Sequence, residues 1–405
     1  MLYQFCERSP GTRRQALRLN FGICEYGALH KFCYLRYMLK DAINLADVQR
    51  TLVIKLRHHG DVLLTSPVFQ VLKNHAPHME IDALVYEDTR EMLSGHPAIS
   101  QVFTIDRAWK EMGLITQVTR EASLLRQLRM RRYDLILHLT EHPRGAWLTR
   151  LLRPRFAVAQ RAVGINEGRD SRWWKASFTH TYPTPRATFR HTVESNLDAL
   201  RRIGVQPENA EKKLVLVPGE AAERKVEALM AAHGIGNKRF IHIHPTSRWF
   251  FKTWPAARFA ELILELGRAG QRVVLTAAPT ADEREMIAAI KTQLKAPVVD
   301  LTGALSLKEL AALTARARVF VGVDSAPMHM AAAMQTPTVA LFGPSGEAHW
   351  GPWAVVHRIV SSQDPRHTCR PCGNDGCGGS KVSECLTELP VSQMLAAVNE
   401  LLATT

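Results

Sequence analysis

The sequence predicts an α/β protein built of two doubly wound parallel domains that face each other across a central cleft. At 405 residues the chain exceeds the length at which one hydrophobic core stays undivided. Short apolar segments, typical of buried parallel strands, alternate with stretches whose apolar residues recur at helical spacing. This alternation runs twice, over residues 51–205 and 214–405, with a charged, proline-containing linker at 206–213 between them.

The first series follows residues 1–50, which lack sustained periodicity and are expected to form a poorly ordered or helical extension. Its strands are expected at 52–56, 80–85, 101–105, 135–139 and 157–163, and its helices at 67–74, 120–131 and 191–203. The strands of the second series are expected at 240–244, 272–276, 298–300, 319–323 and 338–342. Its helices are expected at 256–269, 281–294, 306–315 and 326–334, with a closing helix at 391–402.

Charge is unevenly distributed along the chain, whose formal net charge is +14. Ten arginines lie between Arg120 and Arg161, against only Glu121, Asp134 and Glu141. Such a basic face suits anionic lipid headgroups or a phosphorylated substrate, or is simply a solvated helix surface. We expect no nucleic-acid partner, because no binding motif or interleaved aromatic pattern accompanies the arginines.

The chain has no apolar run near the ~18 residues that span a bilayer. Its first residues are polar and rich in arginine, without the apolar centre of a secretory signal. We therefore expect a cytosolic protein.

The turn after the first strand carries an acidic residue. Gly60 and Asp61 follow an apolar strand and precede a stretch with helical spacing. In open α/β sheets, ligands bind at such turns at the carboxyl ends of strands. Asp61 could take a proton from a hydroxyl, or it could cap the helix that follows.

Three turns of the second half also follow strands. Asp324 or Ser325 could cap a helix that begins near Ala326, and the N–H groups at such a helix start favour phosphate oxygens. A glycine-rich turn at 342–346 follows the next strand. His329 could orient a ligand phosphate or fill a helix–sheet junction. The third turn contains Thr246 and is described next.

Hydroxyl groups of Thr246 and Ser247 precede Lys252, which could neutralise the charge of a departing phosphate or be an ordinary surface lysine. An acid after the strand at 272–276 could bind ribose hydroxyls, and Glu283 is our candidate beside Asp282.

Four cysteines lie within 17 residues near the carboxyl end, with a spacing that could wrap a structural metal ion, hold reduced thiols in a loop or form disulfides. They are Cys369, Cys372, Cys377 and Cys385. We expect no catalytic role for them.

Residues 53–63, 244–255 and 323–329 together resemble the bacterial ADP-heptose:lipopolysaccharide heptosyltransferases, which form glycosyltransferase family 9. The resemblance extends from residue 51 to the end of the chain. Residues 57–61 and 139–145 are most similar to the heptosyltransferase III type, which adds a side-branch heptose to the second heptose of the lipopolysaccharide inner core.

This resemblance implies two Rossmann-like domains of the glycosyltransferase B type, the first binding the acceptor and the second the nucleotide sugar. It implies transfer of L-glycero-D-manno-heptose from ADP-heptose with inversion, without a cofactor or a catalytic metal. Asp61 would be the base, and Lys252 would stabilise the departing ADP. The donor would contact Thr246, Ser247, Asp324, Ser325, Ala326 and His329.

The acceptor implied by the resemblance is the inner core of lipopolysaccharide, at the inner face of the cytoplasmic membrane. The protein would then contact that membrane peripherally, and its basic face would suit the phosphates of the acceptor. Candidate acceptor residues are Arg57, His58, Glu141, His142 and Arg144. Three alternatives stay open: a core heptosyltransferase of type I or II, a nucleotide-sugar epimerase on the same architecture, and a non-catalytic scaffold.

Overall fold

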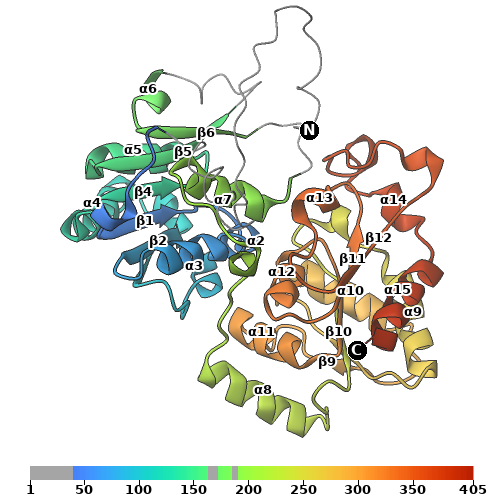
Figure 1. Cartoon of the computed structure of the whole chain (residues 1–405). Helices are drawn as coiled ribbons and strands as arrows, with labels where there is room; N and C mark the ends of the chain where they lie inside the picture. The colour runs from blue at the N-terminus through green and yellow to red at the C-terminus, as the bar shows by residue number, and fades with distance from the viewer. Residues whose placement is uncertain (1–39, 163–171, 185–189, 405) are drawn as a thin grey trace, which may run out of the picture. The chain divides into compact units, whose positions relative to one another are not determined.

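The computed structural model describes residues 40–162, 172–184 and 190–404 (Figure 1). Most of the extension predicted at 1–50 lies outside these residues. Residues 43–405 form one compact unit. This unit begins eight residues before residue 51, where the first domain was predicted to start. The reason is packing, because Ile43 and Val48 are buried in the main hydrophobic core.

The first lobe contains a six-stranded parallel sheet in the order β3-β2-β1-β4-β5-β6. Its strands are β1 (Arg50–Ile54), β2 (Glu80–Tyr86), β3 (Gln101–Ile105), β4 (Leu135–His138), β5 (Phe156–Ala162) and β6 (His180–Thr184). Its helices are α2 (His59–Leu63), α3 (Ser66–His75), α4 (Leu114–Arg131), α5 (Pro143–Leu152), α6 (Arg172–Lys175) and α7 (Thr192–Arg202). Short 3-10 helices are η1 (Leu45–Asp47), η2 (Glu87–Met92) and η3 (Arg107–Glu111).

The second lobe repeats this plan, with the strand order β12-β11-β10-β7-β8-β9. Its strands are β7 (Ile241–His244), β8 (Val273–Leu275), β9 (Val299–Asp300), β10 (Val319–Val323), β11 (Thr338–Phe342) and β12 (His357–Ser361). Its helices are α8 (Glu220–Ala232), α9 (Ala256–Arg268), α10 (Ala281–Lys291), α11 (Leu307–Arg316), α12 (Ala326–Ala333), α13 (Glu347–Trp350), α14 (Glu384–Thr387) and α15 (Val391–Thr404). The remaining 3-10 helices are η5 (Asn209–Lys212), η6 (Phe250–Lys252), η7 (Pro365–His367) and η8 (Cys377–Gly379).

The predicted α/β class with two Rossmann-like parallel sheets is confirmed, and each sheet has one strand that the sequence did not predict. β6 contains Pro183 and pairs only with β5, and proline is tolerated because the strand lies at an edge. β12 begins with the polar residues His357 and Arg358 and is likewise an edge strand. Helix α8 was also not predicted.

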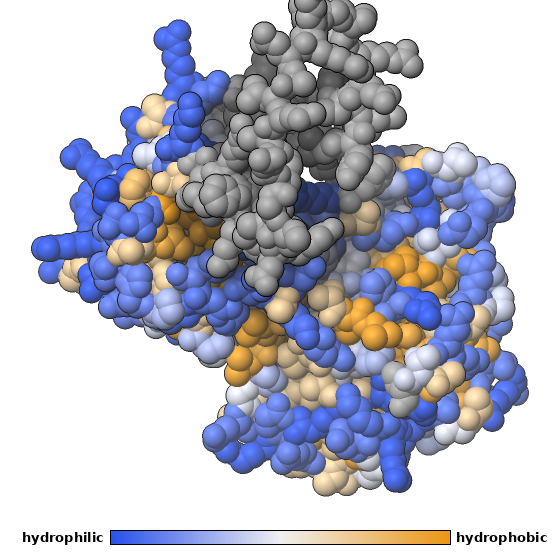
Figure 2. All heavy atoms as spheres, in the orientation of Figure 1, coloured by the Kyte–Doolittle hydropathy of each residue, from blue (hydrophilic) through white to orange (hydrophobic). Residues whose placement is uncertain are grey.

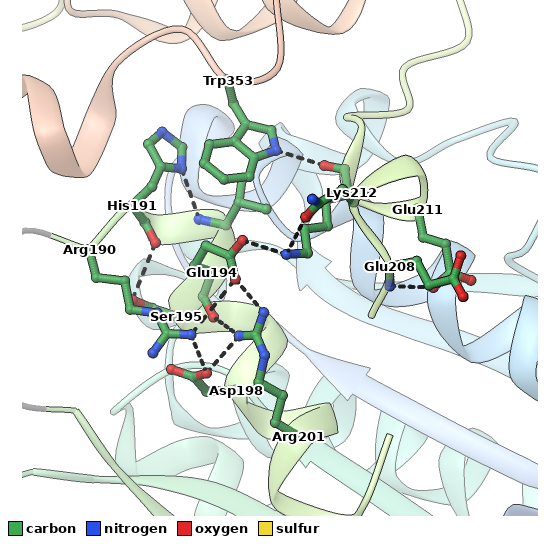
Figure 3. A network of polar contacts seen from close by, with 12 residues as sticks. Arg190, His191, Glu194, Ser195, Asp198, Arg201, Glu208, Glu211, Lys212 and Trp353 are labelled. Atoms are coloured by element: carbon green, nitrogen blue, oxygen red, sulfur yellow. Dashed lines mark hydrogen bonds and ion pairs between the residues drawn. The ribbon is translucent and has the colours of Figure 1, made fainter. Parts of the chain in front are cut away.

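A polar network joins the two lobes around α7 (Figure 3). The ring of Trp353 stacks on that of His191, with centroids 4.4 Å apart, and its Nε1 donates to the carbonyl of Lys212 at 2.7 Å. The ammonium of Lys212 lies 3.0 Å from Glu194 Oε1. Residues 209–212, part of the predicted linker, are therefore held by both lobes.

The lobes also share apolar contacts. Val62 and Leu63 of α2 belong to the same buried cluster as Met330 and Ala333 of α12. Helix α2 follows β1 and helix α12 follows β10, so this contact places one carboxyl-end turn of each sheet close to the other.

The visible face of the molecule is mainly hydrophilic, with separate hydrophobic patches (Figure 2). No helix among the described residues is long and apolar enough to cross a membrane.

Candidate active site

Asp61 is the third residue of α2, partly exposed, and it makes no hydrogen bond to any described residue. His58 is the N-cap of α2, and no side chain caps this helix. The capping interpretation of Asp61 is therefore wrong, and its carboxylate is left available to a ligand.

Lys252 and Asp324 form an ion pair, with Nζ and Oδ2 2.6 Å apart. Lys252 ends the 3-10 helix η6, and Asp324 directly follows β10. The Asp324 side chain is only 6% exposed, whereas Lys252 is 22% exposed and can still reach a ligand. A buried carboxylate paired in this way fixes the position of the ammonium group.

His329 lies where the charges of both lobes converge. Burial lowers the pKa of His329, the charges of Asp324 and Asp61 oppose this shift, and the charge of Lys252 adds to it. The same histidine touches α2, because a Cβ atom placed on Gly60 would lie 2.8 Å from its Cδ2. Asp61, from the first lobe, is thus within electrostatic range of His329 in the second lobe.

The beginning of α12 contains buried polar atoms without partners. Ser325 is the N-cap, one of the two positions predicted for it, but its hydroxyl makes no capping bond. The Oγ of Ser345, in the turn after β11, and Nδ1 of His329 are also buried without a hydrogen-bond partner among the described residues. Because buried polar atoms are nearly always hydrogen-bonded, these orphans mark a place where a ligand would supply partners. Ala326, the first helical residue, is partly exposed beside them.

Thr246 and Glu283 belong to a buried network instead. The Thr246 hydroxyl donates to Glu283 Oε2 at 2.6 Å, and the N–H of Ala278 donates to the same oxygen at 2.8 Å. His244 Nε2 lies 3.2 Å from the Thr246 hydroxyl, and burial lowers the pKa of His244 to about 4. Ser247 is less committed, because its hydroxyl oxygen accepts only a 3.3 Å bond from the N–H of Trp249.

The acceptor candidates beside α2 differ in exposure. Arg57 is exposed, and its carbonyl accepts a hydrogen bond from Arg107 at 3.2 Å. His58 Nδ1 lies 3.5 Å from the guanidinium of Arg248, a contact that crosses from one lobe to the other. Burial lowers the pKa of His58, and the neighbouring arginines lower it further.

The candidates at the start of α5 are already engaged. His142 caps α5, because its Nδ1 accepts a bond from the N–H of Arg144 at 3.1 Å. The Arg144 guanidinium forms a close ion pair with Glu121 of α4. Glu141 precedes this cap and is partly exposed.

Two buried basic residues of the first lobe, at neighbouring strands β1 and β4, were not predicted. Lys55 donates to the carbonyl of Leu139 and to Asn196 Oδ1, each at 3.0 Å, and burial lowers its pKa to about 8 while the charge of Asp61 opposes the shift. His138 ends β4 with neither ring nitrogen hydrogen-bonded to a described residue, and burial lowers its pKa to about 3. A lysine directly after an apolar strand was a usable signal for Lys55, whereas nothing in the sequence singles out His138.

The four carboxyl-terminal cysteines are free thiols. Cys385 is buried, which raises the pKa of its thiol to about 11. Among the described residues, one group has metal-ligating atoms all within 4.8 Å of one another, and it contains no cysteine: Asp364, His367 and Glu388. Arg366 pairs with both of its carboxylates at 2.6 Å and thus occupies the place of a cation.

Comparison with known proteins agrees with this architecture. The sequence profile of glycosyltransferase family 9 (heptosyltransferase) matches residues 121–377. Lipopolysaccharide heptosyltransferase 3 of Escherichia coli is 33% identical over 356 residues, which cover 86% of this chain and 97% of that protein.

Two solved structures share the fold. The family 9 glycosyltransferase of Veillonella parvula superposes with a TM-score of 0.77 at 24% identity, covering 90% of this chain and 100% of that one. Heptosyltransferase II of E. coli superposes with a TM-score of 0.68 at 20% identity, covering 88% and 99%. The predicted glycosyltransferase B type fold is confirmed.

Proposed function

Because the chain belongs to glycosyltransferase family 9, the heptosyltransferase family, we propose that it moves heptose from ADP-heptose to a heptose of the lipopolysaccharide inner core. The similarity to E. coli heptosyltransferase 3, which spans 97% of that protein, supports the type III reaction over types I and II. The observation that carries the proposal is the convergence of Asp61 with Lys252 and Asp324 around His329.

In the proposed reaction Asp61 takes the proton of the acceptor hydroxyl while that oxygen attacks the anomeric carbon of the donor. The bond between this carbon and the diphosphate oxygen breaks, ADP leaves, and the configuration at the carbon inverts. Asp61 suits the role of base because its carboxylate has no hydrogen-bond donor holding it in the structure.

Lys252 would compensate the negative charge that develops on the departing diphosphate. In the structure its ammonium is held 2.6 Å from Asp324, so it is positioned before the donor arrives. Asp324 would accept hydrogen bonds from hydroxyls of the donor sugar on its remaining oxygen.

The diphosphate would lie at the start of α12. Backbone N–H groups at Ser325 and Ala326 lie at this helix start, where anions are favoured. The unpartnered hydroxyls of Ser325 and Ser345 would complete the seat. Of the other two hydroxyls, that of Ser247 is better placed than that of Thr246, which Glu283 already occupies. Glu283 would then contact the donor only through its other oxygen.

The acceptor would enter from the first lobe, in a protein that we propose to be cytoplasmic and peripheral to the inner face of the cytoplasmic membrane. Arg57 and His58 lie at the turn that carries Asp61 and could contact acceptor phosphates. Arg144 would have to exchange Glu121 for such a phosphate. The proposed chemistry requires no metal and no cofactor.

A transfer assay with ADP-heptose and a core acceptor, read by mass spectrometry, tests the proposal. We expect Asp61→Asn to lose transfer while keeping its affinity for ADP, and the exposed Asp47→Asn to leave both unchanged. An epimerase would convert the donor without acceptor, and a scaffold would be indifferent to Asp61→Asn. Core oligosaccharide from a strain lacking the protein should miss one branch heptose, whereas truncation at the first or second heptose would indicate type I or II.

A further inference from the structure

One side of the first lobe concentrates exposed apolar side chains. Ten large hydrophobic side chains are well exposed among the described residues, and seven of them lie on or beside α4 and α5. These seven define the α4–α5 surface: Met112, Leu114, Ile115, Val118, Met130, Trp147 and Leu151. Exposed apolar side chains that gather on neighbouring helices are typical of an interaction site in an otherwise hydrophilic protein.

The first turns of α4 are the most exposed part of this surface. Leu114 is 81% exposed, Ile115 is 86% exposed and Val118 is 65% exposed. The core-facing residues of the same helix are Leu124 and Leu128, which are buried. The amino-terminal half of α4 therefore presents apolar side chains that its packing within the described lobe leaves well exposed.

Arginines continue the same surface toward the end of α4. Arg126, Arg129 and Arg132 line a surface hollow of about 430 Å³, together with Leu125 and Met130. None of these three arginines forms an ion pair with another described residue, whereas Arg131, Arg144 and Arg201 of the same lobe pair with carboxylates. An unpaired guanidinium on an apolar stem suits a boundary between hydrocarbon and phosphate.

Helix α5 adds an aromatic group to the boundary. Trp147 is 55% exposed, and its ring lies 4.9 Å from that of Trp173. Arg129 reaches from α4 to the carbonyl of Leu151 on α5, so the two helices form one surface. Exposed tryptophan beside arginine is the composition found where proteins meet lipid headgroups.

We propose that the α4–α5 surface docks on an anionic phospholipid bilayer. Leu114, Ile115, Val118 and Trp147 enter the headgroup region, and the arginines of the hollow bind lipid phosphates. The proposal deepens the function proposed above, because a lipid-linked acceptor is presented by such a membrane. The carboxyl ends of β1 and β4 lie at one edge of the parallel sheet, so α5 starts at the same edge as the turn of Asp61.

Vesicle co-sedimentation of the full chain tests the docking surface independently of transfer. Wild-type protein should partition onto vesicles containing phosphatidylglycerol and much less onto vesicles of phosphatidylcholine alone. Val118→Asp and Arg126→Glu should each weaken partitioning at least about fivefold. One arginine near an anionic membrane strengthens binding by about that factor, and a new negative charge weakens binding in the same way. Two matched variants, Val356→Asp and Arg224→Glu, place the same changes at exposed positions of the second lobe and should stay near wild type.

All four variants should keep the transfer rate of wild type on a lipid-free core oligosaccharide, which also shows that they fold. The docking proposal is overturned if wild type does not partition onto anionic vesicles, or if the control variants weaken partitioning equally. It is also overturned if the wild-type chain self-associates and Val118→Asp makes it monomeric, since the surface is then a contact between copies. Vesicle binding without transfer would instead overturn the proposed function and leave the docking surface standing.

Discussion

Gly60→Ala tests whether the contact between α2 and α12 positions the reacting groups. A Cβ atom at residue 60 would lie 2.8 Å from Cδ2 of His329 and 3.4 Å from its Nε2. Ordinary carbon–carbon contacts begin about 0.6 Å farther out, and His329 is only 3% exposed and has little room to yield. The added methyl group must therefore push α2 and α12 apart.

Two effects of different size follow from this displacement. Overpacking a buried contact costs roughly 1–3 kcal/mol, which we expect to see as a lower melting temperature. Misplacing the proposed base Asp61 by a fraction of an ångström relative to the donor should lower kcat about 10- to 100-fold, because reaction rate depends steeply on orientation. ADP affinity should change less, because the proposed donor site lies within the second lobe.

Gly267→Ala is the matched control. Gly267 is exposed within α9, and a Cβ atom there would have no neighbour within 4 Å. Because alanine favours a helix over glycine, this variant should be more stable by about 0.5–1 kcal/mol and should keep its transfer rate. Thermal melting and steady-state transfer on purified proteins measure both variants. If Gly60→Ala melts and turns over like wild type, the contact does not set the position of Asp61.

Three further predictions concern charge, acid and metal. Lys252→Met should lower kcat about 100- to 1,000-fold in the transfer assay, because the departing diphosphate loses its cation and Asp324 loses its partner. The folded protein should lose stability in melts as pH falls from about 6.5 to 4, because burial holds the pKa of several histidines below their usual value while the unfolded chain takes up protons first. At pH 5.5, each histidine whose pKa is about 4 or lower should reduce the free energy of unfolding by up to about 1.4 kcal/mol. These histidines are His96, His138, His191, His242 and His244. Treatment with a chelator should leave the transfer rate within about twofold of that of the untreated protein, and metal analysis of the treated chain checks that metal has been removed.

Buried strands carried the strongest signal in the sequence. Ten of the twelve strands were predicted close to their observed positions, because each is an apolar run between turn residues. The two that were missed, β6 and β12, are edge strands that contain polar residues and, in β6, a proline, so neither is an apolar run. Helix α8 did carry a signal, since Ala222, Val226 and Met230 recur every four residues and are buried.

Residue pairing in the candidate site could not be predicted in the same way. The sequence singles out Lys252 and Asp324 separately, but their ion pair joins residues 72 positions apart and exists only in the folded lobe. The capping role considered for Asp61 is wrong because α2 begins three residues earlier than a cap at that position requires. Lys55 could have been noticed as a lysine directly after an apolar strand, whereas His138 is defined by burial, which short sequence patterns do not report.

The site residues fall into two groups: those whose side chains are hydrogen-bonded within the fold, and those whose side chains would gain a hydrogen bond from a ligand. The hydroxyl of Thr246 already donates to Glu283, so Thr246→Val should mainly lower the stability of the second lobe. Ser325 and Ser345 are the opposite case, since their buried hydroxyls have no described partner and would gain one in the proposed complex with the donor. Removing an unused hydroxyl should cost the free protein little and weaken ADP binding. The two cases differ because a hydroxyl that is buried without a partner is tolerated only where a bound ligand offsets the free energy of its desolvation.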